Sequence, residues 1–108
     1  MRGMGNISEM MKQAQKMQEK LQKMQDELKN IIVEASAGGG AVTVTANAAK
    51  QIISVKIEKE LAASGDIEML QDLVTAAVNE ALSKAQESAD AEAKKITGSL
   101  GLNIPGMF

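Results

Sequence analysis

The stretch "AVTVTANAAKQIISVKI", from Ala41 to Ile57, decides the fold of this chain. In its first half valines alternate with threonines, and in its second half Ile53, Val55 and Ile57 alternate with polar residues. A period of two in β-branched residues predicts two strands, each with one apolar and one polar face. Only the short segment "NAAK" separates them, so we expect an antiparallel hairpin.

A third strand precedes this hairpin. The segment "IIVEAS" places Ile31, Val33 and Ala35 on one face, and "AGGG", residues 37–40, joins it to the next strand. This glycine-rich segment lacks the Lys and Ser/Thr of a phosphate-binding loop and connects strand to strand, so we interpret it as a hairpin turn. The result is a three-stranded antiparallel sheet over about residues 31–58.

A helix is predicted before the sheet, over about residues 8–30, with Asn6 or Ser8 as its N-cap. Its apolar residues are spaced four and three apart over three heptads, which is typical of a narrow coiled-coil contact. Such a stripe suits one partner helix or a shallow groove. We call these residues the apolar seam: Met10, Ala14, Met17, Leu21, Met24 and Leu28.

A second long helix is predicted after the sheet, over about residues 66–97, with Asp66 as its N-cap. Its apolar face between Ile67 and Ala85 is wide enough to cover the sheet. Beyond Ala85 only alanines and Ile96 are apolar, so we expect this part to project, break or fray before Gly98. The fold class is therefore α+β, with one domain over residues 1–97 and a flexible tail over 98–108.

Composition narrows the classes of function. The chain has 108 residues, no Cys and no His, which removes thiolate nucleophiles, the usual proton shuttle and the commonest zinc ligands. We therefore expect no enzyme, no metal and no cofactor. Aromatic residues make up 1 %, so the core is aliphatic and small, and dimerisation would help it. Neither a membrane span nor a signal peptide is recognisable, which predicts a cytoplasmic protein.

Charge is unevenly distributed. The net charge is -2, yet residues 1–30 hold six basic and four acidic groups. On a helical wheel four lysines fall within an arc of roughly 80° beside the apolar seam. Three interpretations stay open: a solvated face with helix pairs such as Glu19 to Lys23, a phosphate-binding face, and a membrane-surface helix. The lack of interleaved aromatic residues disfavours a reader of single-stranded bases. This lysine stripe consists of Lys12, Lys16, Lys20 and Lys23.

Three segments carry a resemblance to a known family. They are "MMKQAQKMQ" at the start, "SVKIEKEL" at the end of the last strand, and "DLVTAAVNEAL" in the later helix. Together with their order and spacing, they resemble the YbaB/EbfC family of bacterial nucleoid-associated proteins over essentially the whole chain. One departure lies in the second turn, where the family usually has Gly after Asn and this chain has Ala48 after Asn47.

The resemblance implies a tong-shaped homodimer that binds double-stranded DNA, changes its conformation, and takes part in nucleoid organisation and gene regulation. It places the DNA contacts on the lysine stripe, with Lys94 and Lys95 as weaker candidates. No membrane or small-molecule substrate is implied. Two alternatives come from other classes: a helical holdase chaperone, and a membrane-surface or coiled-coil scaffold protein with no role on DNA.

Overall fold

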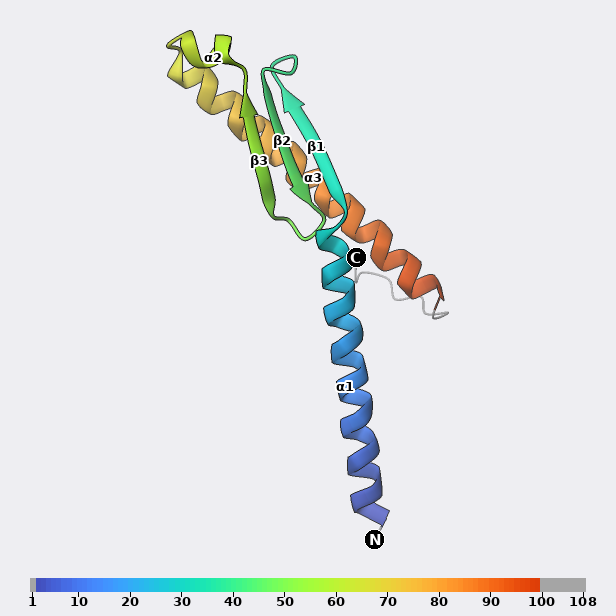
Figure 1. The fold of residues 1–108 in the computed structure, drawn as a ribbon. Coiled ribbons are helices and arrows are strands. Elements are labelled where there is room, and N and C mark those ends of the chain that lie inside the picture. Colours follow the sequence, from blue (N-terminus) through green and yellow to red (C-terminus); the bar gives the residue numbers. More distant parts are fainter. Residues whose placement is uncertain (1, 100–108) are drawn as a thin grey trace.

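The computed structural model describes residues 2–99 of the chain, and the side chains of residues 6–95. It confirms the predicted order of a helix, a three-stranded antiparallel sheet and a long helix (Figure 1). A five-residue helix after the sheet was not predicted, because one turn is too short to show a period. The elements are α1 (Arg2–Lys29), β1 (Ile32–Ala37), β2 (Val42–Asn47), β3 (Ile52–Ile57), α2 (Lys59–Ala63) and α3 (Ile67–Ser99).

The sheet has the order β1-β2-β3, so β2 is central and the other two strands are edges. Val55 of β3 lies opposite Val44 of β2, as the alternation predicts. The register then shifts, and Ala46 lies opposite Ile52. Ile53, which was predicted to continue the apolar face, is therefore the extra residue of an irregularity in β3. The difference from the prediction arises in the pairing of β3 with β2, which the alternation of residues along one strand does not reveal.

The β1–β2 connection is the predicted hairpin turn. Gly38, Gly39 and Gly40 all have positive φ angles, between 65° and 96°, which glycine adopts without steric cost. Gly38 also lies under α3, since a Cβ built on it would meet Leu73 Cδ1 at 2.9 Å. This position therefore needs glycine for two reasons, the backbone angle and the close approach of α3.

The β2–β3 connection accommodates Ala48 without a glycine. The positive φ angle in this turn falls on Lys50, at 66°, and not on the residue after Asn47. Asn47 is 4 % exposed and closes the turn, since its Nδ2 donates to Gln51 Oε1 at 2.8 Å. Its Oδ1 accepts from the Gln51 backbone N–H at 3.1 Å. The turn therefore tolerates Ala48, because the residue with the positive φ angle is Lys50, two positions later.

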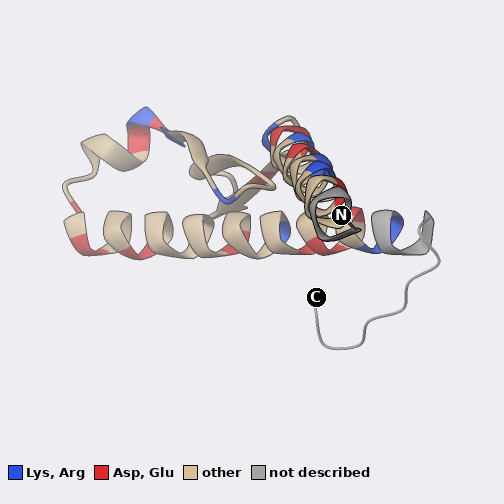
Figure 2. Ribbon diagram, turned by 90° about the horizontal axis from the view of Figure 1, so that it is seen from below, with Lys and Arg blue, Asp and Glu red and all other residues tan. Residues whose placement is uncertain are grey.

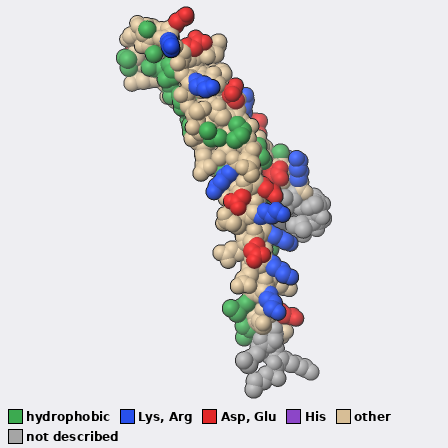
Figure 3. Space-filling model, in the orientation of Figure 1, with side chains coloured by type: hydrophobic (Ala, Val, Ile, Leu, Met, Phe, Trp, Pro, Cys, Tyr) green, Lys and Arg blue, Asp and Glu red, His purple; other side chains and the backbone are tan. Residues whose placement is uncertain are grey.

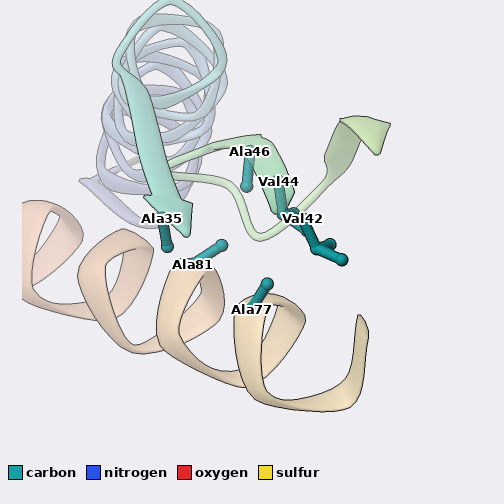
Figure 4. Close-up of a cluster of buried hydrophobic side chains, with 6 residues drawn as sticks. All are labelled: Ala35, Val42, Val44, Ala46, Ala77 and Ala81. Atoms are coloured by element: carbon teal, nitrogen blue, oxygen red, sulfur yellow. The ribbon is translucent and has the colours of Figure 1, made fainter. Parts of the chain in front are cut away.

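The core lies between the sheet and α3 (Figure 4). α3 begins where predicted, because Asp66 Oδ1 accepts from the Met69 backbone N–H at 3.0 Å as an N-cap does. Six of the eight fully buried apolar residues in the described chain are alanines, so α3 approaches the sheet closely but buries little surface. The buried apolar residues are Ala35, Val42, Val44, Ala46, Ala48, Ala77, Ala81 and Ala85.

The two edges of the sheet differ. α3 packs mainly on β1 and β2 and far less on β3, so the predicted apolar face of α3 covers the sheet unevenly. At the β1 edge, Lys84 Nζ donates to the Glu34 carbonyl oxygen at 2.9 Å. Ala48 donates to Ile31, so hydrogen-bonded pairs alternate along β1 and β2 from that end. Glu34 and Thr45 are then a non-hydrogen-bonded pair, and the Glu34 carbonyl points away from β2. The β1 edge is thus partly closed, and β3 stays open.

α1 leaves the sheet as an arm (Figure 1). It starts at Arg2, so Asn6 and Ser8 lie inside the helix, and the prediction that one of them is the N-cap is wrong. No proline or packing contact stops the helix at those residues, which explains the longer span. The radius of gyration is 20.7 Å, whereas a compact chain of this length has about 13 Å. The molecule is therefore elongated.

α3 also extends past the sheet. It continues through Gly98 to Ser99, so the helix does not break before Gly98. A single glycine in a helix costs only about 1 kcal/mol relative to alanine, which a long helix tolerates. Residues 100–108 of the predicted flexible tail lie outside the described residues.

Candidate nucleic-acid interface

The α1 arm is joined to the body at one end only. The buried Ala48 N–H donates to the carbonyl oxygens of Leu28 and Ile31, at 3.1 and 2.9 Å. These bonds tie the last turn of α1 to the β2–β3 connection. Every residue from 6 to 23 is exposed. A helix of 28 residues is about 42 Å long, so most of this length stands free of the body.

The four lysines of the lysine stripe are all exposed, and blue side chains follow one side of α1 in Figure 3. Within the described residues none of them forms a salt bridge, and the expected pair of Glu19 with Lys23 is absent. The acidic groups of α1 are engaged elsewhere or stay in solvent; Asp26, for example, accepts from Gln22 Nε2 at 3.3 Å. The lysine ammonium groups are thus available to an external anion.

The apolar seam is exposed along the free part of the arm. The exposed fractions are 67 % for Met10, 60 % for Met17 and 53 % for Leu21. Only Met24 and Leu28, near the junction with the sheet, are half-buried. Ala14 is exposed as well. Within the described chain the seam therefore has no partner helix along most of its length.

Lys94 and Lys95 lie on a different helix from the stripe. Both are exposed on the last turns of α3, which leave the sheet at an angle to α1 (Figure 1). Lys95 Nζ is 3.9 Å from Glu92 Oε2, a long pair between an exposed lysine and a half-buried glutamate. On α3 blue positions lie near the middle and towards the far end, while red positions begin at the first turn (Figure 2). The six candidate lysines therefore do not form one continuous stripe.

One exposed apolar surface was not predicted. We call Ile52, Ile53, Val55 and Ile57 the β3 patch; its members are between 40 % and 52 % exposed. Val55 and Ile57 lie opposite Val44 and Val42, so they share the face that α3 covers on the other strands. The alternation of residues marks this face as apolar, but it does not indicate which strand the helix leaves uncovered.

No three or more carboxylates among residues 2–99 lie close enough together to hold a metal ion. None of the helices in this range is both long and apolar enough to cross a membrane.

Comparison with known proteins gives the family. The model of the YbaB/EbfC DNA-binding family matches residues 4–100. The chain belongs to this family. A nucleoid-associated protein of Acetivibrio thermocellus is 58 % identical over 104 residues, which cover 96 % of this chain and 91 % of that protein. A nucleoid-associated protein of Clostridium novyi is 56 % identical over 109 residues, which cover 98 % of this chain and 94 % of that protein. The resemblance in the three sequence segments is thereby confirmed.

A solved structure supports the fold. The crystal structure of an uncharacterized protein from Helicobacter pylori superposes with a TM-score of 0.69. The superposed region covers 82 % of this chain and 94 % of the Helicobacter pylori chain, and the two sequences are 21 % identical. At this identity the similarity shows that the YbaB/EbfC fold is shared, and no more.

Proposed function

We propose that this YbaB/EbfC protein binds double-stranded DNA through the phosphate backbone, with the lysine stripe of α1 as the contact surface. The proposal rests on one observation, that the lysine ammonium groups of the stripe are available to bind phosphate. Four lysines are exposed on one side of a helix that stands away from an acidic body, and none of them forms an ion pair with a described residue. Lysine ammonium groups bind phosphate as point charges and carry no information on base sequence.

The charge distribution has a consequence for affinity. Residues 31–108 hold six basic and ten acidic groups, so the body repels DNA while the arm attracts it. Binding is therefore weak, sensitive to salt and largely independent of sequence. If about six lysines of a dimer contact phosphate, log affinity falls with log salt at a slope of about -5. We infer a role in nucleoid organisation and gene regulation, in the cytoplasm at the nucleoid; the names of the nucleoid-associated relatives support the association with the nucleoid.

We propose further that the protein is a homodimer. The described part of the single chain buries eight small apolar residues and exposes the whole β3 patch, and an open apolar edge strand is a site of association. A second copy supplies a matching surface, because a two-fold interface brings the same patch from both subunits together.

The direction of the arms selects between two dimers. α1 precedes β1, and β1 runs parallel to β3 because both are antiparallel to β2. Antiparallel pairing of two β3 edges would reverse the second subunit and point its arm the opposite way. Packing of one β3 patch on the other, about an axis parallel to the strands, keeps both arms on one side. Only the second arrangement lets two arms hold the same duplex and alter its conformation.

A charge-matched pair of variants tests the DNA contact. In the arm variant Lys16, Lys20 and Lys23 become alanine, and in the body variant Lys50, Lys56 and Lys59 become alanine. Both lose the same net charge, so a difference between them reports location alone. Fluorescence anisotropy on a labelled generic duplex should show affinity reduced by about tenfold or more for the arm variant at low salt. The body variant should stay within about twofold of wild type. Equal losses, or no loss in the arm variant, would reject the lysine stripe.

A further inference from the structure

Within the described residues, the free part of the apolar seam on α1 is a coiled-coil surface that no other element covers. Its members recur every three and four residues, and three of them are more than half exposed. The dimer proposed above uses the β3 patch, at the other end of the molecule from the tip of α1. That dimer therefore leaves the free part of the seam uncovered.

We propose that the seam joins neighbouring dimers on DNA, by parallel pairing of one α1 helix from each dimer. This inference rests on the proposed function, because it concerns dimers that already hold a duplex between their two arms. Pairing of the two seams within one dimer would bring those arms together and leave no space for the duplex. The partner of the seam is thus a third protein chain of the same sequence.

The period of the seam identifies α1 itself as the partner. A heptad seam packs by inserting its side chains into the spaces of another heptad seam. The other long helix, α3, already uses its apolar face on the sheet, where Ala77, Ala81 and Ala85 are fully buried. Among the described elements, α1 alone presents a free heptad stripe, so a second copy of α1 matches it.

The residues that flank the seam favour parallel pairing. In a parallel pair, flanking Gln13 lies opposite Gln18 of the other helix, and Lys20 lies opposite Gln25, so no like charges meet. In an antiparallel pair centred between Met17 and Leu21, Lys20 would face its own copy. Like charges in contact disfavour that arrangement.

Pairing through the seam is compatible with DNA binding. The centre of the lysine stripe lies about 120° around the helix from the centre of the seam. Lys12, Lys16 and Lys23 fall outside the positions that flank the seam, and all are exposed. The same helix therefore contacts a neighbouring α1 on one side and phosphate on another.

The contact is weak by itself. It spans only three heptads and includes Ala14, whose short side chain buries little area. On DNA, however, the duplex holds neighbouring dimers at an effective concentration in the millimolar range. The seam should then act mainly as a source of cooperativity, so that several dimers bind a long duplex more tightly than one dimer binds a short one.

The first experiment compares two duplexes, one long enough for a single dimer and one long enough for several. In the seam variant Met10, Met17 and Leu21 become glutamine, and a control variant carries Gln15→Ala and Gln22→Ala on the outer side of α1. Wild type and control should bind the long duplex sigmoidally and about tenfold more tightly per dimer. The seam variant should lose this gain and keep its affinity for the short duplex within about twofold of wild type.

The outcomes separate the two proposals. Cooperative binding by the seam variant would overturn the inference and leave the proposed function intact. Absence of wild-type binding to either duplex would overturn the proposed function, and the inference with it. Circular dichroism of each variant shows whether α1 remains helical.

The second experiment uses the absence of cysteine from the chain. Ala14→Cys introduces one thiol in the seam, and parallel pairing brings two such thiols together at disulfide distance. Under mild oxidation we expect covalent pairs on the long duplex only. Gln15→Cys, which lies outside the seam, should form few pairs under the same conditions. Covalent pairs of the Ala14→Cys protein on the short duplex, or without DNA, would place the contact inside one dimer and overturn the proposal.

Discussion

The body and the α1 arm of this YbaB/EbfC protein differ in what their side chains contact. Every fully buried side chain of the described residues belongs to the body, between residues 35 and 85. On the arm, residues 6–23 are all exposed, although apolar Met and Leu recur there. The stability of the single chain therefore comes from the body. Substitutions on the surface of the arm should leave the core intact.

The difference teaches that an apolar pattern does not by itself mean a core within the same chain. Val44 and Met17 both belong to regular apolar patterns, but the first is fully buried and the second is 60 % exposed. The sheet packs against α3 in the same chain, whereas the free part of the α1 seam contacts no other described element. Five predictions, in order of expected effect, test this division and the contacts of the body on which it rests.

The largest effect is expected from a charge in the body. Val44→Asp places an unpaired carboxylate in the central strand and should reduce the free energy of unfolding by at least about 4 kcal/mol. Met17→Asp, the same chemical change on the arm, should cost less than about 1 kcal/mol. Urea unfolding followed by circular dichroism measures both. Similar losses in the two variants would show that the arm belongs to the same cooperative core.

The second prediction concerns the β3 patch. Val55→Asp combined with Ile57→Asp should weaken the proposed dimer by about 100-fold or more, because two carboxylates would be buried in its interface. The control, Ser54→Asp with Lys56→Asp, adds two carboxylates to the opposite face of the same strand. Sedimentation velocity over a range of concentrations gives the dissociation constants. A dimer that persists in the first variant, or dissociates equally in the control, would place the interface elsewhere.

The third prediction concerns two glycines of one turn. Gly38→Ala should lower stability by about 2 kcal/mol, since it adds a contact with Leu73 to the strain of a positive φ angle. Gly39→Ala has a similar φ angle, but a Cβ there meets nothing within 4 Å. Its cost should be about 1 kcal/mol. Thermal unfolding of both variants measures the difference. Equal losses of stability would mean that the Leu73 side chain moves aside without cost.

The fourth prediction tests the turn at the base of the arm. Asn47→Ala removes two hydrogen bonds to Gln51 in a buried position, which should cost about 1–2 kcal/mol of stability. Asn79→Ala, on the exposed side of α3, should leave stability unchanged or slightly raised, since alanine is the better helix former. A loss at Asn79 as large as that at Asn47 would contradict the role of the turn.

The smallest expected effect is an increase in stability, from a substitution at Lys50. Lys50 has a φ angle of 66°, which costs a non-glycine residue about 1 kcal/mol. Lys50→Gly relieves this strain but adds entropy to the unfolded chain, so a net gain of about 0.5 kcal/mol is expected. Lys56→Gly, within β3, should have the opposite sign. Chemical denaturation resolves the two signs, and a loss at Lys50 would contradict the strain.

Local signals in the sequence predicted several features correctly. Asp66 is the N-cap of α3, and Val42 and Val44 point into the core, because capping and strand alternation depend on neighbouring residues. The first hairpin turn was predicted from its glycines. These features need no knowledge of the rest of the fold.

Features that depend on distant contacts could not be predicted. The displaced Ile53 results from the pairing of β3 with β2, and the bond from Lys84 to the β1 edge joins residues 50 positions apart. The exposure of Val55 depends on the strands that α3 covers. On the arm, helical periodicity placed the lysines on one side, but the absence of the Glu19 to Lys23 pair depends on side-chain conformation.

The salt dependence of DNA binding tests the central claim most directly. Affinity for a generic duplex is measured between about 50 and about 200 mM salt, for wild type and for the variant in which Lys12, Lys16, Lys20 and Lys23 become alanine. The account predicts a slope of log affinity against log salt of about -5 for wild type and a much smaller slope for the variant. A wild-type slope near zero, or the same slope in both proteins, would contradict phosphate binding by the α1 arm.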